Sequence, residues 1–207
     1  MDVTKSTYDA SAAELAEFFA GFGSRKEEID RACDTVQTGA SSLTVLELGC
    51  GDGRDAGDIL VRAGDYIGID YSRELIALAK AKHPDYAEAF QVANMKDFAV
   101  KPAEYDVIFA FASFLHLSRE ELGVLLRRYC EALKEGGVMC MDFKYADNYE
   151  RRQQVDRFGE RIFYYYHPNE VIAMLPDEMR EVNRRLFQKG STKWFGLTVR
   201  KGVSNND

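Results

Sequence analysis

Short runs of apolar residues recur along the chain and alternate with segments in which apolar residues follow helical spacing. The runs predict buried strands at 44–48, 66–70, 89–93, 105–111 and 138–143. The helical spacing predicts helices near 54–63, 73–82 and 119–133, the last of which is followed by a pair of glycines. Strands and helices that alternate in this way are typical of a parallel sheet with helices on both faces.

The two ends of the chain depart from this alternation. Apolar spacing predicts helices at 9–19 and 26–38, before the first strand. Near the other end, 179–187 and 193–200 are strand-like, and the short connection between them indicates an antiparallel pair. We therefore predict an α/β fold: a three-layer sandwich with a mostly parallel, seven-stranded sheet and a C-terminal antiparallel hairpin.

The composition suits one domain that binds neither nucleic acid nor membrane. Of 207 residues, 34 are acidic and 27 are Lys or Arg; nucleic-acid binding would need clustered cations. The start of the chain lacks the apolar core of a signal peptide, and the most apolar segment, 107–117, is too short to cross a bilayer, so a cytoplasmic location is expected. We expect a helical cap, one α/β domain and a disordered tail at 1–40, 41–202 and 203–207.

The cysteines do not suggest a metal site. They form no C-x-x-C pair and have no histidine cluster near them in the sequence. We expect buried free thiols and no bound metal. The cysteines are Cys33, Cys50, Cys130 and Cys140.

A glycine-rich turn follows the first predicted strand and is the most informative segment of the chain. Gly49, Gly51 and Gly53 alternate with other residues before a helix expected from about Arg54. Glycine allows positive φ and lets a ligand approach the backbone, and the start of a helix offers unpaired N–H groups. Because Glu47 stands just before the turn, the site suits a zwitterion better than a phosphate.

Asp70 ends the next predicted strand, at the edge where open α/β sheets bind ligands. A carboxylate at this place can accept hydrogen bonds from both hydroxyls of a ribose, so a dinucleotide and S-adenosylmethionine both fit. The dinucleotide pattern G-x-G-x-x-G, started at Gly49, needs its third glycine where the chain has Arg54. The third glycine is Gly53 instead, and Glu47 would repel a pyrophosphate, which favours S-adenosylmethionine.

The segment E-L-G-C-G-D-G at 47–53 resembles the first motif of class I S-adenosylmethionine-dependent methyltransferases. Further landmarks of that family follow in order, at Asp70, 93–95, 105–110 and 133–138. With the terminal hairpin, the resemblance covers about residues 40 to 200. Within the family, the chain resembles small bacterial members. It implies a Rossmann-like fold in which 41–202 is the catalytic domain, and transfer of a methyl group from S-adenosylmethionine.

The resemblance also implies which residues hold the cofactor. Glu47 would lie near its ammonium, backbone groups of the glycine turn would contact its methionine end, and Asp70 would hold the ribose. Tyr71 would pack on the adenine, which Asn94 would contact through its side-chain oxygen and Met95 through its backbone N–H. Asn94 departs from the usual Asp of the family. The predicted set is Glu47, Gly49, Cys50, Gly51, Gly53, Arg54, Asp70, Tyr71, Ser72, Asn94, Met95 and Phe111.

The reaction itself requires little of the protein, because a sulfonium is already an activated methyl donor. The enzyme must orient the acceptor, exclude water and sometimes remove a proton. His116, Tyr8 and Tyr145 are the candidates for accepting a proton or contacting the substrate, and Phe111 would line the wall near the methyl group. An alternative role for His116, with equal support, is to form a hydrogen bond with a backbone group near the start of a helix.

Four features allow both a functional and a structural interpretation. Arg54 would pair either with the cofactor's carboxylate or with a nearby aspartate in a surface salt bridge. The aromatic run at 163–166 is interpreted as packing on the sheet rather than as a wall around a cationic acceptor. Arg161 is interpreted as solvated, and Trp194 as a core residue.

The sequence gives the least information about the substrate. Only the N-terminal segment to about Phe22 and the stretch 144–167 remain to cover an acceptor, which indicates a small molecule or a single exposed side chain. We expect a monomer or a homodimer. Two other functions stay open, an NAD-dependent oxidoreductase and a non-catalytic module that binds S-adenosylmethionine.

Overall fold

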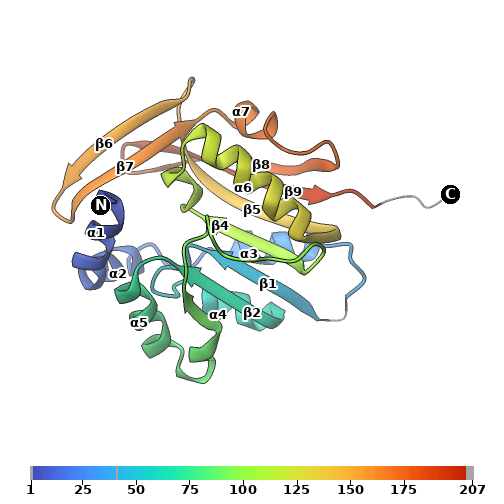
Figure 1. Cartoon of the computed structure of the whole chain (residues 1–207), viewed down its shortest axis with the longest axis horizontal. Helices are drawn as coiled ribbons and strands as arrows, with labels where there is room; N and C mark the ends of the chain where they lie inside the picture. The colour runs from blue at the N-terminus through green and yellow to red at the C-terminus, as the bar shows by residue number, and fades with distance from the viewer. Residues whose placement is uncertain (1, 41, 204–207) are drawn as a thin grey trace.

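The computed structural model describes residues 2–40 and 42–203. Within these residues lies a nine-stranded sheet of order β3-β2-β1-β4-β5-β7-β6, with β9 paired to β5 and β8 paired to β9 (Figure 1). The five strands predicted from apolar runs are β1 (Leu43–Leu48), β2 (Ala63–Asp70), β3 (Phe90–Val92), β4 (Tyr105–Phe111) and β5 (Leu133–Tyr145). They pair in parallel, which confirms the predicted fold class.

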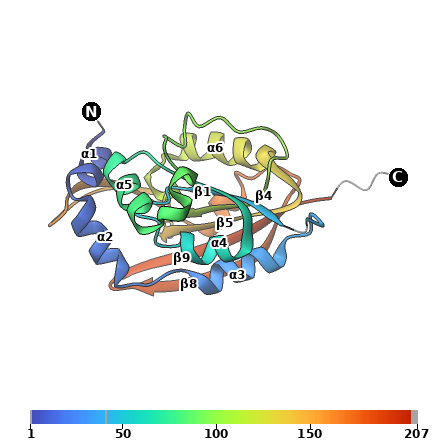
Figure 2. The ribbon, with the colours of Figure 1, turned by 90° about the horizontal axis from the view of Figure 1, so that it is seen from below.

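Helices cover both faces of the parallel strands, as Figure 2 shows. On one face, α6 (Arg119–Ala132) packs on side chains such as Leu46 and Ile108. On the other face, α3 (Lys26–Thr35), α4 (Ala56–Arg62) and α5 (Arg73–Lys82) pack on the alternate side chains. Every residue of β4 is buried, as expected for a central strand with both faces covered.

The predicted C-terminal hairpin is present. Strands β8 (Met179–Lys189) and β9 (Thr192–Lys201) run antiparallel, and β9 is antiparallel to β5. The two residues between them include Gly190 at a φ of 57°, which a tight hairpin turn favours. The hairpin ends close to the carboxyl ends of the parallel strands, so its turn reaches the site described below.

A second hairpin, which the apolar pattern does not predict, accounts for the two extra strands. It consists of β6 (Glu150–Asp156) and β7 (Gly159–Tyr166), which are antiparallel to each other. The last residues of β5, Lys144 and Tyr145, continue past β4 and pair in parallel with the end of β7. Strand β6 is polar and mostly exposed, so its sequence lacks the apolar run that identifies a buried strand.

The helix expected at 9–19 is divided in two. Helix α1 (Val3–Ala10) ends at Ser11, and α2 (Ala12–Ala20) follows at once. The hydroxyl of Ser11 donates to the carbonyl oxygen of Phe158 at 2.7 Å, so the break is fixed by the loop between β6 and β7. Short helices complete the fold at η1 (Pro84–Ala89), η2 (Phe114–His116) and α7 (Pro168–Ile172). The predicted disordered tail at 203–207 lies outside the described residues except for Val203.

Candidate functional site

A cleft of about 750 Å³ opens at the carboxyl ends of β1, β2 and β4. It is also lined by the N-terminal helices and by the ends of β5, β7 and β9. Open α/β sheets bind ligands at this edge, and clefts of about 300–1,000 Å³ are typical of small-molecule sites. The cleft therefore brings the predicted glycine turn together with two segments that come much later in the chain.

The glycine turn has the predicted left-handed backbone. Gly49, Gly51 and Gly53 have φ values of 75°, 57° and 72°. A Cβ atom on Gly49 would lie 2.5 Å from the Cβ of Ser113, whereas one on Gly51 would meet nothing within 4 Å. Gly49 is therefore required for packing, and Gly51 leaves room for a ligand against the backbone.

Gly53 serves the fold and does not line the cleft. Its carbonyl oxygen lies 2.8 Å from Nε2 of His83, and a Cβ atom on it would meet the same ring at 3.0 Å. The helix after the turn begins at Ala56, two residues later than the sequence predicts. Gly53 is thus a predicted cofactor residue that the structure does not bring to the cleft.

Glu47 is buried at the floor of the cleft, with 2% of its surface exposed. It accepts a hydrogen bond of 2.6 Å from the hydroxyl of Tyr66. Burial, and next the charge of Asp55, raise the pKa of Glu47 to about 8. Glu47 is thus mostly protonated at neutral pH until a positive group binds beside it.

A buried ion-pair network lies next to Glu47. Arg25 contacts Asp55 at 2.5 Å and Asp142 at 3.0 Å, and Arg54 contacts Asp55 at 3.3 Å. The Arg54 side chain is only 14% exposed, so its aspartate pair is not the surface salt bridge considered above. Arg25 was not predicted, because its two carboxylate partners are 30 and 117 residues away in sequence.

Asp70 is held with its carboxylate at the cleft. Its two oxygens accept N–H bonds from Gly51 at 3.1 Å and Ser72 at 2.8 Å. Burial raises the pKa of Asp70 to about 6. Ser72 is fully buried, caps α5 and donates to Asp9 of α1 at 2.7 Å, so it shapes the site without lining it. Tyr71 lines the cleft beside Asp70.

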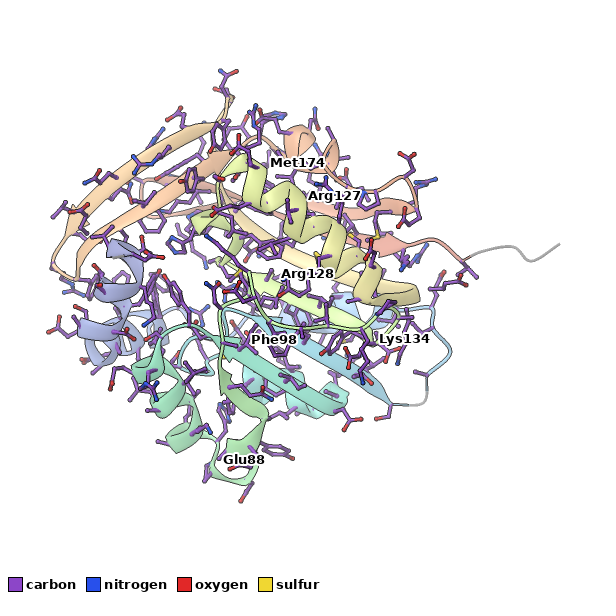
Figure 3. All side chains as sticks on the ribbon, viewed as in Figure 1. Glu88, Phe98, Arg127, Arg128, Lys134 and Met174 are labelled. Carbon is purple, nitrogen blue, oxygen red and sulfur yellow. The ribbon has the colours of Figure 1, made fainter. Side chains whose placement is uncertain are left out.

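The loop after β3 reaches the cleft through Asn94 and Met95. The side-chain oxygen of Asn94 accepts the backbone N–H of Lys96 at 3.0 Å, so this oxygen is already used within the loop. Tyr129 donates to the Met95 carbonyl oxygen at 2.7 Å, and Arg128 of α6, labelled in Figure 3, donates to that of Lys96 at 2.6 Å. Helix α6 therefore fixes the position of this loop.

His116 and Tyr8 form a hydrogen-bonded pair at the cleft. His116 Nδ1 lies 2.7 Å from the carbonyl oxygen of Ile162, and Nε2 lies 3.1 Å from the hydroxyl of Tyr8. A carbonyl can only accept, so Nδ1 carries the proton and Nε2 accepts from Tyr8. Burial lowers the pKa of His116 to about 4, so the ring is neutral. His116 thus satisfies a backbone group and lines the cleft at the same time.

Tyr145 lies outside the cleft, which corrects its prediction as a substrate contact. Successive side chains on a strand point to opposite faces, and its neighbour Lys144 is the one that lines the cleft. The Tyr145 ring contacts His167 and Phe195, and its hydroxyl donates to Asp147 at 2.7 Å.

Lys144, Arg161 and Trp194 line the cleft although sequence reasoning did not select them. Arg161 is 6% exposed, so the interpretation that it is solvated is wrong. Trp194 is the third residue of β9 and lines the cleft as well as packing on buried side chains. Lys144 is 8% exposed, and burial lowers its pKa to about 7. The sequence signal for Arg161 was present, as a cation within an aromatic strand.

Several buried polar atoms at the cleft have no hydrogen-bond partner within the described chain. Such atoms are costly unless water or a ligand satisfies them. All of the following belong to residues that line the cleft: Arg54 Nε, Tyr71 Oη, Ser113 Oγ, Arg161 Nε and Trp194 Nε1. The cleft is therefore built for polar groups that the chain does not supply.

In the part of the chain that the structure describes, neither a group of metal-binding side chains nor a membrane-spanning helix is found. Three or more His, Cys, Asp or Glu side chains are nowhere grouped so as to hold a metal ion among these residues. The four cysteines are buried and free, and burial raises the pKa of Cys140 to about 12. No helix in 2–40 or 42–203 is long and apolar enough to span a membrane.

Part of the chain is similar to a known protein family. Residues 45–137 match the family model described as a methyltransferase domain. An uncharacterized methyltransferase of Bacillus cereus is 31% identical over 123 residues, and one of Bacillus anthracis is 30% identical over the same length. Each alignment covers 58% of this chain and 56% of the relative. Residues 45–137, somewhat less than half of the chain, are therefore similar to a methyltransferase domain, and the chain spans about half the length of the curated relatives it matches.

Solved structures share the fold at low sequence identity. The 1,6-didemethyltoxoflavin-N1-methyltransferase of Burkholderia thailandensis, solved with S-adenosylhomocysteine, has a TM-score of 0.70 at 17% identity over 96% of this chain and 87% of that one. The 4+2 cyclase SpnF has a TM-score of 0.73 at 15% identity over 98% of both chains. The fold alone therefore does not determine the reaction.

Proposed function

We propose that the protein transfers a methyl group from S-adenosylmethionine to a small-molecule acceptor. The observation that carries this proposal is the pair of carboxylates at one cleft. Glu47 and Asp70 lie near the ends of the neighbouring strands β1 and β2, and both line the cleft on either side of the glycine turn. Within one molecule, the ammonium can pair with one carboxylate and the ribose hydroxyls can donate to the other. A pyrophosphate, which is itself negative, would be repelled by the first carboxylate.

The residues present fit the cofactor. The unpartnered atoms of Arg54 and Tyr71 lie in the part of the cleft formed by the glycine turn and the end of β2. We assign Glu47 to the ammonium, Arg54 to the carboxylate and Asp70 to the ribose. The backbone at Gly49, Cys50 and Gly51 and the side chains of Tyr71, Asn94 and Met95 complete the cofactor part of the cleft.

The chain's own contribution to the reaction is orientation. When bound, S-adenosylmethionine supplies the activated methyl group. Phe111 walls the cleft next to the turn, and α1 covers it through Tyr8. Because the neutral His116 accepts from Tyr8 and has a low pKa, this pair holds the acceptor rather than acting as a strong base. Acceptors that lose their proton easily are therefore favoured.

Calorimetry with S-adenosylhomocysteine tests the assignment of the site. Asp70→Asn keeps the shape of the side chain but removes its charge and one acceptor, so affinity should fall about 10- to 100-fold. Asp65→Asn, an exposed change on the same strand, is the matched control and should bind as the native chain does. Equal affinity of Asp70→Asn and the native chain would show that the ribose is not held there.

Activity needs a separate measurement. Methyl-tritiated S-adenosylmethionine mixed with a metabolite extract should yield a labelled small molecule only when the active chain is present. Binding without transfer would favour a non-catalytic module. Binding of NAD, with none of S-adenosylhomocysteine, would favour an oxidoreductase instead.

A further inference from the structure

The cleft differs in charge between its two halves. In the half formed by the glycine turn, Arg25 and Arg54 are both paired with Asp55. The other half is formed by β5, β7 and the turn between β8 and β9. Three cations of the described chain line it, Lys144, Arg161 and Lys189. Asp156 of β6 also lines it, and so does Asp2, which precedes the helix packed on β7. The second half therefore carries excess positive charge beside the proposed cofactor site.

Lys144 is one of two buried cations that the structure describes in this half of the cleft, the other being Arg161. Its ammonium lies 3.3 Å from the ring centroid of Phe163 and 5.9 Å from that of Trp194. Its hydrogen bond goes to the neutral amide oxygen of Gln154 at 3.1 Å, and it makes no ion pair within the described chain. A buried ammonium without a carboxylate partner is costly, which is the physical reason for its lowered pKa.

Arg161 shares the same aromatic surface. Its guanidinium carbon lies 5.4 Å from the ring centroid of Phe163, on which Lys144 also sits. One of its amino groups pairs with Asp156, while its Nε has no partner. The indole N–H of Trp194 is likewise unpartnered. Two cations thus lie near the Phe163 ring, and two N–H groups of the cleft, Arg161 Nε and Trp194 Nε1, are free to bind a ligand.

We propose that the acceptor molecule is a small planar carboxylic acid whose carboxylate binds between Lys144 and Arg161 and whose apolar body lies against Trp194. When Lys144 is protonated, it and Arg161 carry two positive charges against the single negative charge of Asp156, so one positive charge is left uncompensated. A monoanion neutralises it, whereas a phosphate dianion would leave excess negative charge in a buried site. This inference rests on the proposed function and specifies its substrate class.

The same geometry argues against a cationic acceptor. An aromatic wall at 163–166 is present, but the ammonium of Lys144 already occupies the ring face of Phe163. A second cation there would meet both Lys144 and Arg161 at short range. The ring of Phe163 therefore contacts the protein's own cation, Lys144, and the ammonium of Lys144 can bind an anion.

The test uses the full chain saturated with S-adenosylhomocysteine. Calorimetry measures binding of benzoate, phenylacetate and indole-3-acetate, each against its uncharged amide and against inorganic phosphate. Lys144→Met and Arg161→Gln each remove one cation and keep much of the side-chain length. Arg151→Gln, an exposed change on β6 of the same hairpin, is the matched control. Arg161→Gln loses the ion pair with Asp156 and could fail to fold. In that case the result for Lys144→Met alone tests the inference.

At least one carboxylate should bind the native chain and the Arg151→Gln control at least about tenfold more tightly than its amide. This preference should disappear in Lys144→Met and Arg161→Gln, with unchanged affinity for S-adenosylhomocysteine. Equal binding of acid and amide, no binding of any acid, tighter binding of phosphate, or a preference that survives loss of Lys144 would overturn the inference. Failure of the native chain to bind S-adenosylhomocysteine would instead contradict the proposed function.

Discussion

Glu47 shows how one buried residue links ligand charge to proton binding. The groups that face it are Tyr66, Asp55, Arg25 and Arg54. Tyr66 donates to it, and the arginines favour its ionised form, but burial and the charge of Asp55 outweigh them and keep its pKa near 8. A ligand ammonium placed beside Glu47 would favour the carboxylate, so binding must expel a proton.

Binding of S-adenosylhomocysteine at pH 7 should therefore release up to about one proton. The proton comes from Glu47, whose pKa falls from about 8 when the ammonium binds. Calorimetry in buffers of different ionisation enthalpy measures the release as a slope. Glu47→Gln, which cannot ionise, should abolish the slope and lower the affinity about tenfold. A native slope of zero would mean that Glu47 does not meet the ammonium.

At the scale of elements, α1 is attached to the molecule mainly through β7. Thr7 donates to the carbonyl oxygen of Glu160 at 2.6 Å, and Thr4 accepts the N–H of Ile162 at 3.0 Å. Gly159, at a φ of 127°, leaves room for Thr7, because a Cβ atom there would lie 2.9 Å from the Thr7 hydroxyl. The extra hairpin is thus the support that holds α1, and with it Tyr8, over the cleft.

Thr7→Val removes the hydroxyl and keeps the shape of the side chain. We expect the free energy of unfolding to fall by about 1 kcal/mol and the affinity for S-adenosylhomocysteine to fall several-fold, because α1 loosens. Amide hydrogen exchange in residues 3–10 should become faster. Thr35→Val, whose hydroxyl bonds only to the Arg31 carbonyl oxygen within α3, is the control and should leave exchange in α1 unaltered. Unchanged exchange in Thr7→Val would refute this account of α1.

At the scale of the whole molecule, His116 joins three segments that are far apart in the sequence. It sits in η2, accepts from Tyr8 of α1 and donates to Ile162 of β7. Its folded-state pKa of about 4 is below the ordinary value of 6.5. The unfolded chain therefore takes up the proton first as the pH falls, and stability is lost from about pH 6.5 toward pH 4.

Chemical unfolding at pH 7.5 and pH 5.0 should reveal this loss. The native chain should lose about 2 kcal/mol more than His116→Gln over this interval, because the variant has no ring to protonate. The two proteins must be compared because Glu47 and Asp70, whose folded-state pKa values are raised, increase the stability as the pH falls. This opposing contribution is the same in both proteins and cancels in the difference. Parallel pH profiles for the two proteins would rule out a buried neutral His116.

Much of the fold was predictable because its central strands are buried on both faces. Residues 107–111 of β4 form a continuous apolar run, and the segment before the glycine turn is nearly so. The hairpin of β6 and β7 was not predictable, because β6 is a polar edge strand that carries little of the apolar signal. The division of α1 from α2 depends on Ser11 bonding to Phe158, a contact between residues far apart in sequence.

The sequence by itself determined the half of the cleft that we assign to the cofactor, since Glu47, the glycine turn and Asp70 lie at the ends of two successive strands, and strand ends in a parallel sheet meet at one edge. Only the tertiary structure decided the other half. Lys144 and Arg161 come together because β5 extends past β4 to pair with β7, and no local pattern encodes that register. The geometry of a turn depends on residues that are neighbours in the sequence. The net charge of the cleft depends on which strands, distant in the sequence, pair beside it.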